Sequence, residues 1–183
     1  MGKILYTFLF LVFSCSFAFS QDQGKPFLRN YTPKEYKGHA QNWSMAQDGR
    51  GIVYIGNGNG VMEYDGSTWR MIELPNKVTA RSMAVSEDGI VYVGTSNGFG
   101  YMSVDQVGSS VFIPLDSSLP DTVKEQITDV WVTNVIGSTV YFRTYATLFR
   151  YSNGKLDSFK PKTEGRLFFT SFVLKDQYYL EEA

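Results

Sequence analysis

An internal repeat constrains the fold of this 183-residue chain more than any other feature of its sequence. Residues Ser44–Val61 align without a gap with Ser82–Phe99 at an offset of 38, and 10 of the 18 columns are identical. A weaker third copy aligns around Tyr141, and a fourth begins around Tyr179. Repeats of about 40 residues are typical of propellers and solenoids, in which each unit buries its faces against its neighbours. The chain is therefore expected to form a series of similar, mutually dependent units.

Each copy carries the signals of four short antiparallel strands. In the first copy, turns rich in Asp, Asn and Gly separate four runs suited to strands. The runs are Gln41–Ala46, Ile52–Gly56, Val61–Tyr64 and Thr68–Ile72. Four antiparallel strands in about 40 residues form one blade of a β-propeller. We therefore predict an all-β fold: an incomplete β-propeller of about three four-stranded antiparallel blades and the start of a fourth, preceded by a signal peptide.

The repeat also predicts blade boundaries and the places of individual residues. Blades are expected at about 41–72, 80–115, 126–160 and 166–183, the last one incomplete, after a lead-in segment at 21–40. Four tyrosines should take equivalent positions on the same strand of successive blades: Tyr54, Tyr92, Tyr141 and Tyr179. The last strands would leave an open sheet edge, so we expect the chain to associate or to fold only marginally.

The interval between the second and third copies is longer than the first, 49 residues instead of 38. The segment Ser103–Glu125 falls in this interval, is rich in Ser and Asp, and contains Pro114 and Pro120. We predict that it forms an excursion on one face of the propeller. Loops on a rigid scaffold often carry recognition residues, and a neutral insertion is the alternative.

The first 20 residues have the pattern of a secretory signal peptide. Lys3 precedes the apolar run Ile4–Phe13, and Ala18–Ser20 offers small residues before a cut at Gln21. The apolar run is shorter than the roughly 20 residues of a membrane-spanning helix. A lipoprotein signal at Cys15 is an alternative. We predict a signal peptide at 1–20 and a periplasmic or extracellular location, which leaves a mature chain without cysteine.

The balance of charges and the scarcity of metal-ligating residues exclude several functions. The chain has 17 basic and 18 acidic residues with no block of one sign, so no direct binding of nucleic acid is predicted. With one histidine and no mature cysteine, we predict no metal and no cofactor. That histidine, His39, is expected in a surface loop, although a catalytic triad could use no other. The run Gly56–Gly60 lacks the lysine of a phosphate-binding loop and is predicted to be a hairpin turn.

Acidic and aromatic residues supply the remaining candidates. Three aspartates precede glycine in predicted turns, where their side chains should accept hydrogen bonds from nearby backbone N–H groups: Asp48, Asp65 and Asp88. Asp129, at the start of a predicted inner strand, is the one acid placed to act at the mouth of a channel; a structural role is the alternative. Three tryptophans are expected to pack between blades, with stacking on a sugar ring as the alternative: Trp43, Trp69 and Trp131.

The pattern of Asp48–Gly66 closely resembles the two-component regulator propeller repeat. It reads Asp-Gly, Ile-Val-Tyr-Ile-Gly, Asn-Gly-Val and Tyr-Asp-Gly, and Asp88–Gly98 repeats its first half, although the second copy lacks the Tyr-Asp-Gly-x-x-Trp ending. The match covers Gln41 to about Leu156 and, more faintly, extends to Leu180. In that family the propeller is the periplasmic sensor of a larger protein, usually followed by a three-tyrosine domain, a membrane helix and a cytoplasmic output.

The resemblance implies that the chain is the amino-terminal part of a longer protein. Its partners would be an extracellular ligand, for which a glycan is one candidate, and the downstream domains of the same protein, which alone would contact the membrane. We predict a non-catalytic, ligand-sensing propeller of a bacterial signal-transduction regulator, without hydrolytic activity. No catalytic, metal-binding or cofactor-binding residue is predicted, and the ligand-binding residues are left open. A secreted propeller enzyme or lectin acting on polysaccharide is the alternative, and an enzyme would need acids that converge from several blades.

Overall fold

The computed structural model describes residues 28–183, and residues 31–183 form one compact unit. The predicted signal peptide and the first part of the lead-in, 21–27, lie outside the described residues. Helices in the described part are short: α2 (Pro33–Tyr36), η1 (Pro75–Lys77), η2 (Asp116–Ser118) and α3 (Asp121–Lys124). None of these helices is long and apolar enough to cross a membrane.

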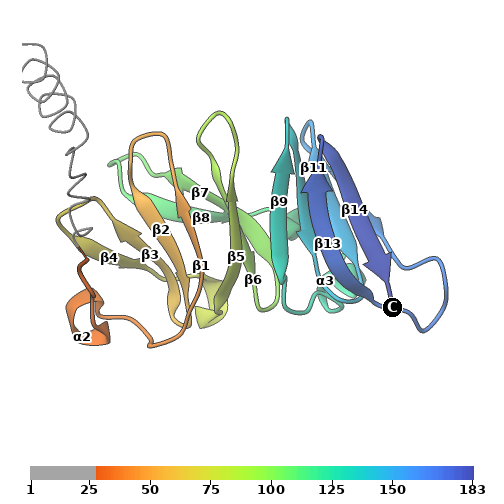
Figure 1. Ribbon diagram of the computed structural model, residues 1–183, viewed down its shortest axis with the longest axis horizontal. Helices are drawn as coiled ribbons and strands as arrows, with labels where there is room; N and C mark the ends of the chain where they lie inside the picture. Colours follow the sequence, from red (N-terminus) through yellow and green to blue (C-terminus); the bar gives the residue numbers. More distant parts are fainter. Residues whose placement is uncertain (1–27) are drawn as a thin grey trace, which may run out of the picture. The chain divides into compact units, whose positions relative to one another are not determined.

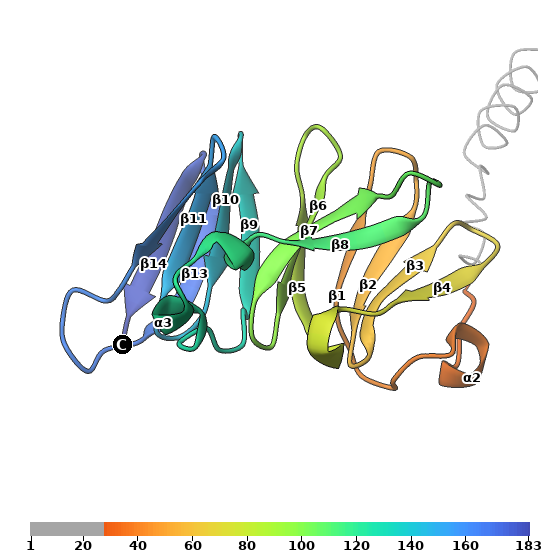
Figure 2. The same cartoon turned by 180° about the vertical axis from the view of Figure 1, so that it is seen from behind.

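The strands of residues 28–183 form three four-stranded sheets and one two-stranded sheet, all antiparallel, with neighbouring strands consecutive in the chain (Figures 1 and 2). Blade 1 contains β1 (Asn42–Gln47), β2 (Val53–Asn57), β3 (Gly60–Tyr64) and β4 (Trp69–Ile72). Blade 2 contains β5 (Ala80–Val85), β6 (Val91–Thr95), β7 (Phe99–Val104) and β8 (Ser110–Pro114). Blade 3 contains β9 (Val132–Ile136), β10 (Thr139–Arg143), β11 (Leu148–Ser152) and β12 (Lys155–Phe159). The two-stranded sheet, called the terminal hairpin below, contains β13 (Phe168–Leu174) and β14 (Gln177–Glu182). The predicted incomplete, all-β propeller is confirmed.

Two of the three predicted turn aspartates bond to the backbone of the turn that they were expected to close. The carboxylate of Asp48 accepts hydrogen bonds from the backbone N–H groups of Arg50 and Ile52, and that of Asp65 closes the β3–β4 turn in the same way. Burial raises the pKa of Asp48, but the hydrogen bonds from Arg50 and the backbone outweigh it, so the pKa lies below its ordinary value. In blade 2 the prediction for Asp88 is wrong, because Asp88 accepts a bond from the Ser86 hydroxyl instead of a backbone N–H.

The blades pack face to face. In each blade we call the face toward the next blade in the chain the leading face, and the opposite one the trailing face. The first core joins the leading face of blade 1, with Tyr54 and Val61, to the trailing face of blade 2, with Val91 and Val93. The second core joins blade 2 to blade 3 through five further buried residues: Tyr92, Phe99, Val140, Phe142 and Phe149.

The four repeat tyrosines occupy the second strand of successive sheets, as predicted. Tyr54 and Tyr92 are 2% and 9% exposed because the next blade covers them. Tyr141 stacks on Tyr178 of the terminal hairpin, with ring centroids 4.5 Å apart. Tyr179 belongs to the leading face of the hairpin and is 41% exposed. The offset of the repeat therefore preserves both strand and face.

The inner strands of blades 1, 2 and 3 approach one another closely because the second strand of blade 1 and that of blade 2 each carry a glycine near their end. A Cβ atom on Gly56 would lie 2.9 Å from the carbonyl oxygen of Ala80, and one on Gly94 would lie 2.5 Å from Cγ1 of Val130. Blade 3 has Arg143 in the corresponding place. A larger side chain there faces the terminal hairpin.

The predicted excursion at Ser103–Glu125 is wrong in its first half. Residues 103–104 end β7, and 110–114 form β8, the fourth strand of blade 2. The carboxylate of Asp105 accepts hydrogen bonds from the N–H groups of Val107 and Ser109, much as Asp65 closes the corresponding turn of blade 1. Only the connection from Leu115 onward, with η2 and α3, extends the repeat (Figure 2).

Candidate ligand-binding site at the inner strands

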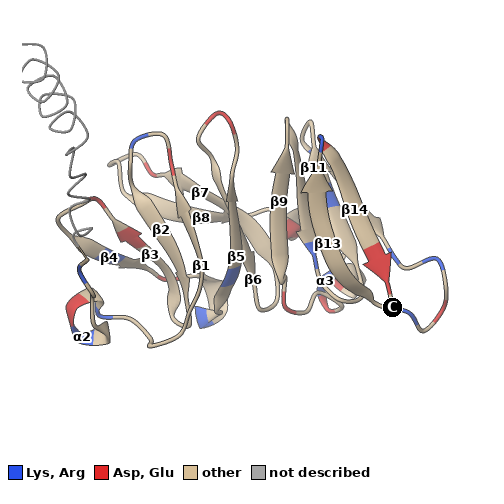
Figure 3. Cartoon of the chain, in the orientation of Figure 1, with Lys and Arg blue, Asp and Glu red and all other residues tan. Residues whose placement is uncertain are grey.

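Side chains from three blades meet where the inner strands begin. β1, β5 and β9 are the first strands of their sheets, and in Figure 1 β9 and β13 run upward from the lower end. The turn between β10 and β11 lies at that same end, because adjacent strands are antiparallel. Figure 3 shows that most strand positions carry no charge, so an arginine on an inner strand is unusual in this molecule.

Arg81 of β5 is at the centre of this cluster. Its Nε donates a hydrogen bond of 2.7 Å to Oδ1 of Asp129, and the two side chains are 18% and 31% exposed. The guanidinium carbon lies 4.0 Å from the ring centroid of Trp43 and 5.0 Å from that of Trp131. A guanidinium over an indole face is attracted by the ring quadrupole and stays in place. Two blades thus hold an arginine supplied by the blade between them.

The aromatic surface extends from blade 1 to the terminal hairpin. Trp43 and Trp131 meet edge to face at 6.2 Å, and Trp131 contacts Tyr145 of the β10–β11 turn at 5.9 Å. The carbonyl of Tyr145 accepts a 2.7 Å bond from the N–H of Phe168, whose own carbonyl accepts a 2.7 Å bond from Nη1 of Arg143. Trp43 and Tyr145 remain 42% and 40% exposed.

This arrangement offers two exposed aromatic rings beside a hydrogen-bond donor and an acceptor. Within residues 28–183, the hydrogen bonds of Arg81 go only to Asp129, so its Nη groups can donate elsewhere. The carboxylate of Asp129 can accept hydrogen bonds, while its ion pair with Arg81 keeps the local charge near zero. No group of three or more metal-ligating side chains occurs in this described range. The cluster is suited to binding a neutral, polar molecule with a flat apolar face.

The structure brings together three of the residues considered from the sequence: Trp43, Trp131 and Asp129. The expectation that Trp43 is buried between blades is wrong, since it is partly open to solvent. The expectation is also wrong for Trp69, which stacks on Tyr64 of its own blade at 4.4 Å and contacts Tyr31 and Tyr36 of the lead-in. His39 is in an exposed loop, as predicted, and its Nδ1 accepts the N–H of Gln41.

Two residues of the site were missed by the sequence analysis, Arg81 and Tyr145. Arg81 could have been found, because it stands 38 residues after Trp43 and therefore at the same place in the next blade. No pattern marks Tyr145, which belongs to the site through the turn between β10 and β11. Gly56–Gly60 spans the β2–β3 hairpin turn, as predicted.

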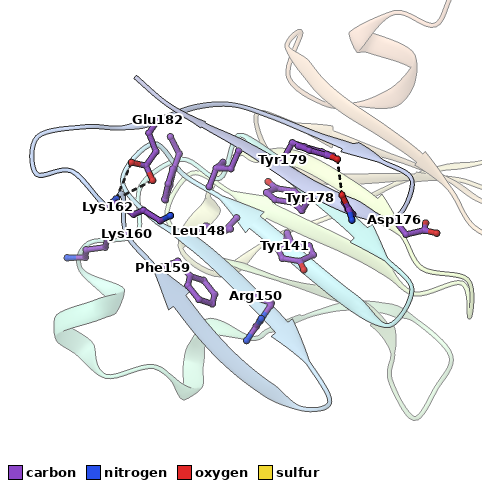
Figure 4. A pocket seen from close by; sticks show the side chains of 13 residues that line it. Tyr141, Leu148, Arg150, Phe159, Lys160, Lys162, Asp176, Tyr178, Tyr179 and Glu182 are labelled. Atoms are coloured by element: carbon purple, nitrogen blue, oxygen red, sulfur yellow. Dashed lines mark hydrogen bonds between the residues drawn. The ribbon is translucent and has the colours of Figure 1, made fainter.

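A separate groove of about 750 Å³ lies between blade 3 and the terminal hairpin (Figure 4). Its lining includes the apolar residues Leu148, Phe159 and Tyr178, and Lys162 and Glu182 stand at its border, joined by a hydrogen bond from the Lys162 N–H to the carboxylate. In the other two blade interfaces, the third and fourth strands of the following blade occupy this place. We therefore treat the groove as part of the blade interface and the Arg81 cluster as the candidate ligand-binding site.

Comparisons with known proteins support the fold. No protein-family model and no curated protein matches the chain. Among solved structures, it is similar to the extracellular domain of the putative one component system BT4673 from B. thetaiotaomicron, with a TM-score of 0.56, 19% identity and 82% of this chain covered. A structure described as the extracellular domain of the putative hybrid two component system BT4673 gives a TM-score of 0.59 at 21% identity over 79% of this chain. Virginiamycin B lyase from Staphylococcus aureus gives 0.51 at 15% identity, over 82% of this chain and 56% of its own.

These neighbours share a fold with the chain and cover different functions. The chain spans about a fifth of the length of the two BT4673 structures, 21% and 19%. These two neighbours agree with the propeller fold that the repeat predicts. The third neighbour is a lyase, so the fold by itself does not separate sensing from catalysis.

Proposed function

We propose that the chain is the ligand-binding, non-catalytic part of an exported sensor in a bacterial signal-transduction regulator. The observation that carries the proposal is the Arg81 cluster, which three blades build together. A neutral carbohydrate fits the cluster best: its ring can stack on Trp43, and its hydroxyl groups can bond to Arg81 and Asp129. Its downstream partners would be further domains of the same protein.

A non-catalytic role is supported by the state of Asp129. Catalysis on a glycosidic bond generally uses two carboxyl groups that flank the bond. Asp129 is paired with Arg81 at 2.7 Å. Because Arg81 already occupies one oxygen of this carboxylate, the arrangement supports holding a ligand over catalysis.

Tryptophan fluorescence tests the proposal directly. Two of the three tryptophans, Trp43 and Trp131, lie in the site, and Trp69 does not. We expect titration with one member of a panel of neutral gluco-, manno- and xylo-oligosaccharides to change the emission saturably. The variant Trp43→Ala should bind that sugar at least about tenfold more weakly, a loss of roughly 1.4 kcal/mol.

The control variant is Trp69→Phe, which leaves the site untouched and should bind as the unchanged chain does. Binding that survives both Trp43→Ala and Arg81→Ala would show that the ligand binds elsewhere. Release of reducing sugar that disappears in Asp129→Asn would favour the enzyme alternative.

A further inference from the structure

A pocket of about 260 Å³ lies between blades 2 and 3, at the end of the inner strands opposite the Arg81 cluster. The β5–β6 turn of blade 2 and the β9–β10 turn of blade 3 form its two walls. Its lining includes the polar residues Ser86, Glu87, Asp88, Tyr92 and Ser138, together with Gly137. Both walls belong to interior blades, so neither end of the described chain takes part in the pocket.

The β5–β6 turn repeats the β1–β2 turn of blade 1 with the same backbone. In both turns the first N–H bonds to the carbonyl oxygen four residues later, at 3.1 and 3.0 Å. Gly51 and Gly89 both take the left-handed conformation, with φ angles of 84° and 83°. Asp88 therefore occupies the backbone position that Arg50 occupies in blade 1. Figure 3 shows the consequence: the β5–β6 turn carries only acidic residues, whereas the β1–β2 turn also carries a basic one.

In blade 1, the side chain of Arg50 joins this turn to the repeat tyrosine. Its Nη2 donates a hydrogen bond of 2.9 Å to the hydroxyl of Tyr54. Its Nε and Nη2 also donate to Oδ2 of Asp48, at 2.9 and 2.7 Å. One guanidinium thus bridges a carboxylate and a tyrosine hydroxyl at this end of blade 1.

Blade 2 keeps a carboxylate and the tyrosine hydroxyl but has no basic residue between them. Tyr92 lines the pocket and is 9% exposed, and its hydroxyl makes no hydrogen bond within residues 28–183. Burial and then the charge of Asp88 raise the pKa of Tyr92, so the carboxylate lies near the hydroxyl. Glu87 and Asp88 are exposed and form no ion pair in the same described range. The pocket therefore combines two negative charges with a buried, unpartnered hydroxyl.

We propose that this pocket binds the guanidinium group of a ligand, either an arginine side chain or a small guanidine, in the place that Arg50 fills in blade 1. The planar donors of a guanidinium can bond to the carboxylate of Asp88, and the hydroxyl of Tyr92 can accept the bond that Tyr54 accepts in blade 1. A divalent metal ion fits less well, because it takes six or more oxygen ligands and the described residues contain no cluster of three acidic or other metal-ligating side chains.

Titration with guanidinium compounds, followed by amide chemical shifts, tests the proposal. N-acetyl-arginine methylamide represents an arginine side chain of a polypeptide, and butylguanidinium represents a small guanidine. At least one should shift the amide signals of Glu87, Asp88 and Gly137 saturably. The neutral isosteres, N-acetyl-citrulline methylamide and butylurea, should bind at least about tenfold more weakly, because they lack the charge-assisted hydrogen bond. Tighter binding of the capped arginine would identify a polypeptide ligand, and tighter binding of butylguanidinium a small one.

Two substitutions exchange the properties of the two turns. Asp88→Arg gives blade 2 the guanidinium that blade 1 already has, and it should abolish the shifts. Arg50→Ala removes the guanidinium beside Tyr54, so the same compound should then also shift the amide signal of Gly51. The Arg50 side chain is 60% exposed and Asp88 is exposed, so circular dichroism should stay unchanged. Glu164→Gln is the control, because it removes an exposed negative charge outside the pocket and should leave binding unchanged.

Three results would overturn the proposal. The first is binding of no compound, or shifts confined to other parts of the chain. The second is equal binding of the neutral isosteres, or unchanged binding by Asp88→Arg. The third is binding that appears only beside Tyr54 in Arg50→Ala, which would show that blade 1 accepts a guanidinium and the blade 2 pocket does not. Sugar binding at the Arg81 cluster should be the same in Asp88→Arg, because the two sites lie at opposite ends of the blades.

Discussion

The interface between blades 2 and 3 and the one between blade 3 and the terminal hairpin use the same repeat positions in different ways. At the first, Gly94 lets Val130, two residues before β9, approach closely, and the core is apolar, with Phe99 and Phe142 stacked at 4.4 Å. At the second, Arg143 stands where the other blades have glycine. Its Nε and Nη1 donate hydrogen bonds to the Ser171 hydroxyl and the Phe168 carbonyl.

The difference teaches how a blade interface depends on the size of the second unit. A four-stranded partner supplies enough apolar surface to bury a phenylalanine completely. The two-stranded hairpin supplies less, and 5%-exposed Arg143 holds its first strand through polar bonds instead. Burial lowers the pKa of Arg143 from its ordinary value, but hydrogen bonds of a guanidinium stay strong because the group remains charged.

The largest expected effect is at the apolar interface. Phe142→Ala removes a fully buried ring between blades 2 and 3 and should lower the free energy of unfolding by about 3–5 kcal/mol. Phe159→Ala is the matched change near the hairpin, where the ring is 41% exposed, and it should cost less than half as much. Urea unfolding of both variants checks the comparison. Equal losses would mean that the two interfaces contribute alike.

A smaller effect is expected at the polar interface. Arg143→Met leaves the Phe168 carbonyl and the Ser171 hydroxyl without their donor, which should cost about 1–3 kcal/mol. Hydrogen exchange should show the loss in β13 and β14 before blades 1 and 2. Arg150→Met is the control, because the Arg150–Asp157 pair is exposed and should contribute little to stability. Uniform loss of protection across all blades would contradict a local role for Arg143.

The smallest effect concerns the longer connection between blades 2 and 3. Asp116 is half-buried there beside Gly98, and burial raises its pKa above the ordinary value of 3.8. The raised pKa means that its contribution to stability is fully present below pH 3.8 and is lost as pH rises through the folded pKa. Asp116→Asn should therefore raise the thermal midpoint slightly at pH 7 and lose this advantage below pH 3.8. The same advantage at both pH values would contradict a role for ionisation.

The sequence alone determined the blades, because a repeat with an offset of 38 preserves strand, face and turn together. Tyr54 and Tyr179 could be placed from that offset without any coordinates. Asp48 and Asp65 could be assigned to turns, because an aspartate side chain bonds to backbone only a few residues away. Such features are local, and local rules are enough to predict them. The β7–β8 hairpin was missed because its turn lacks the Tyr-Asp-Gly ending of blade 1.

Only the tertiary structure decided which residues form the site. Trp43, Arg81 and Trp131 lie on three different blades: Trp43 and Arg81 stand at register irregularities of β1 and β5, and Trp131 directly precedes β9. Their contacts depend on how closely successive inner strands approach, which Gly56 and Gly94 permit. The pairing of Asp129 with Arg81 joins residues 48 positions apart. A repeat pattern fixes each blade separately, whereas the angle and distance between blades arise from packing of their faces.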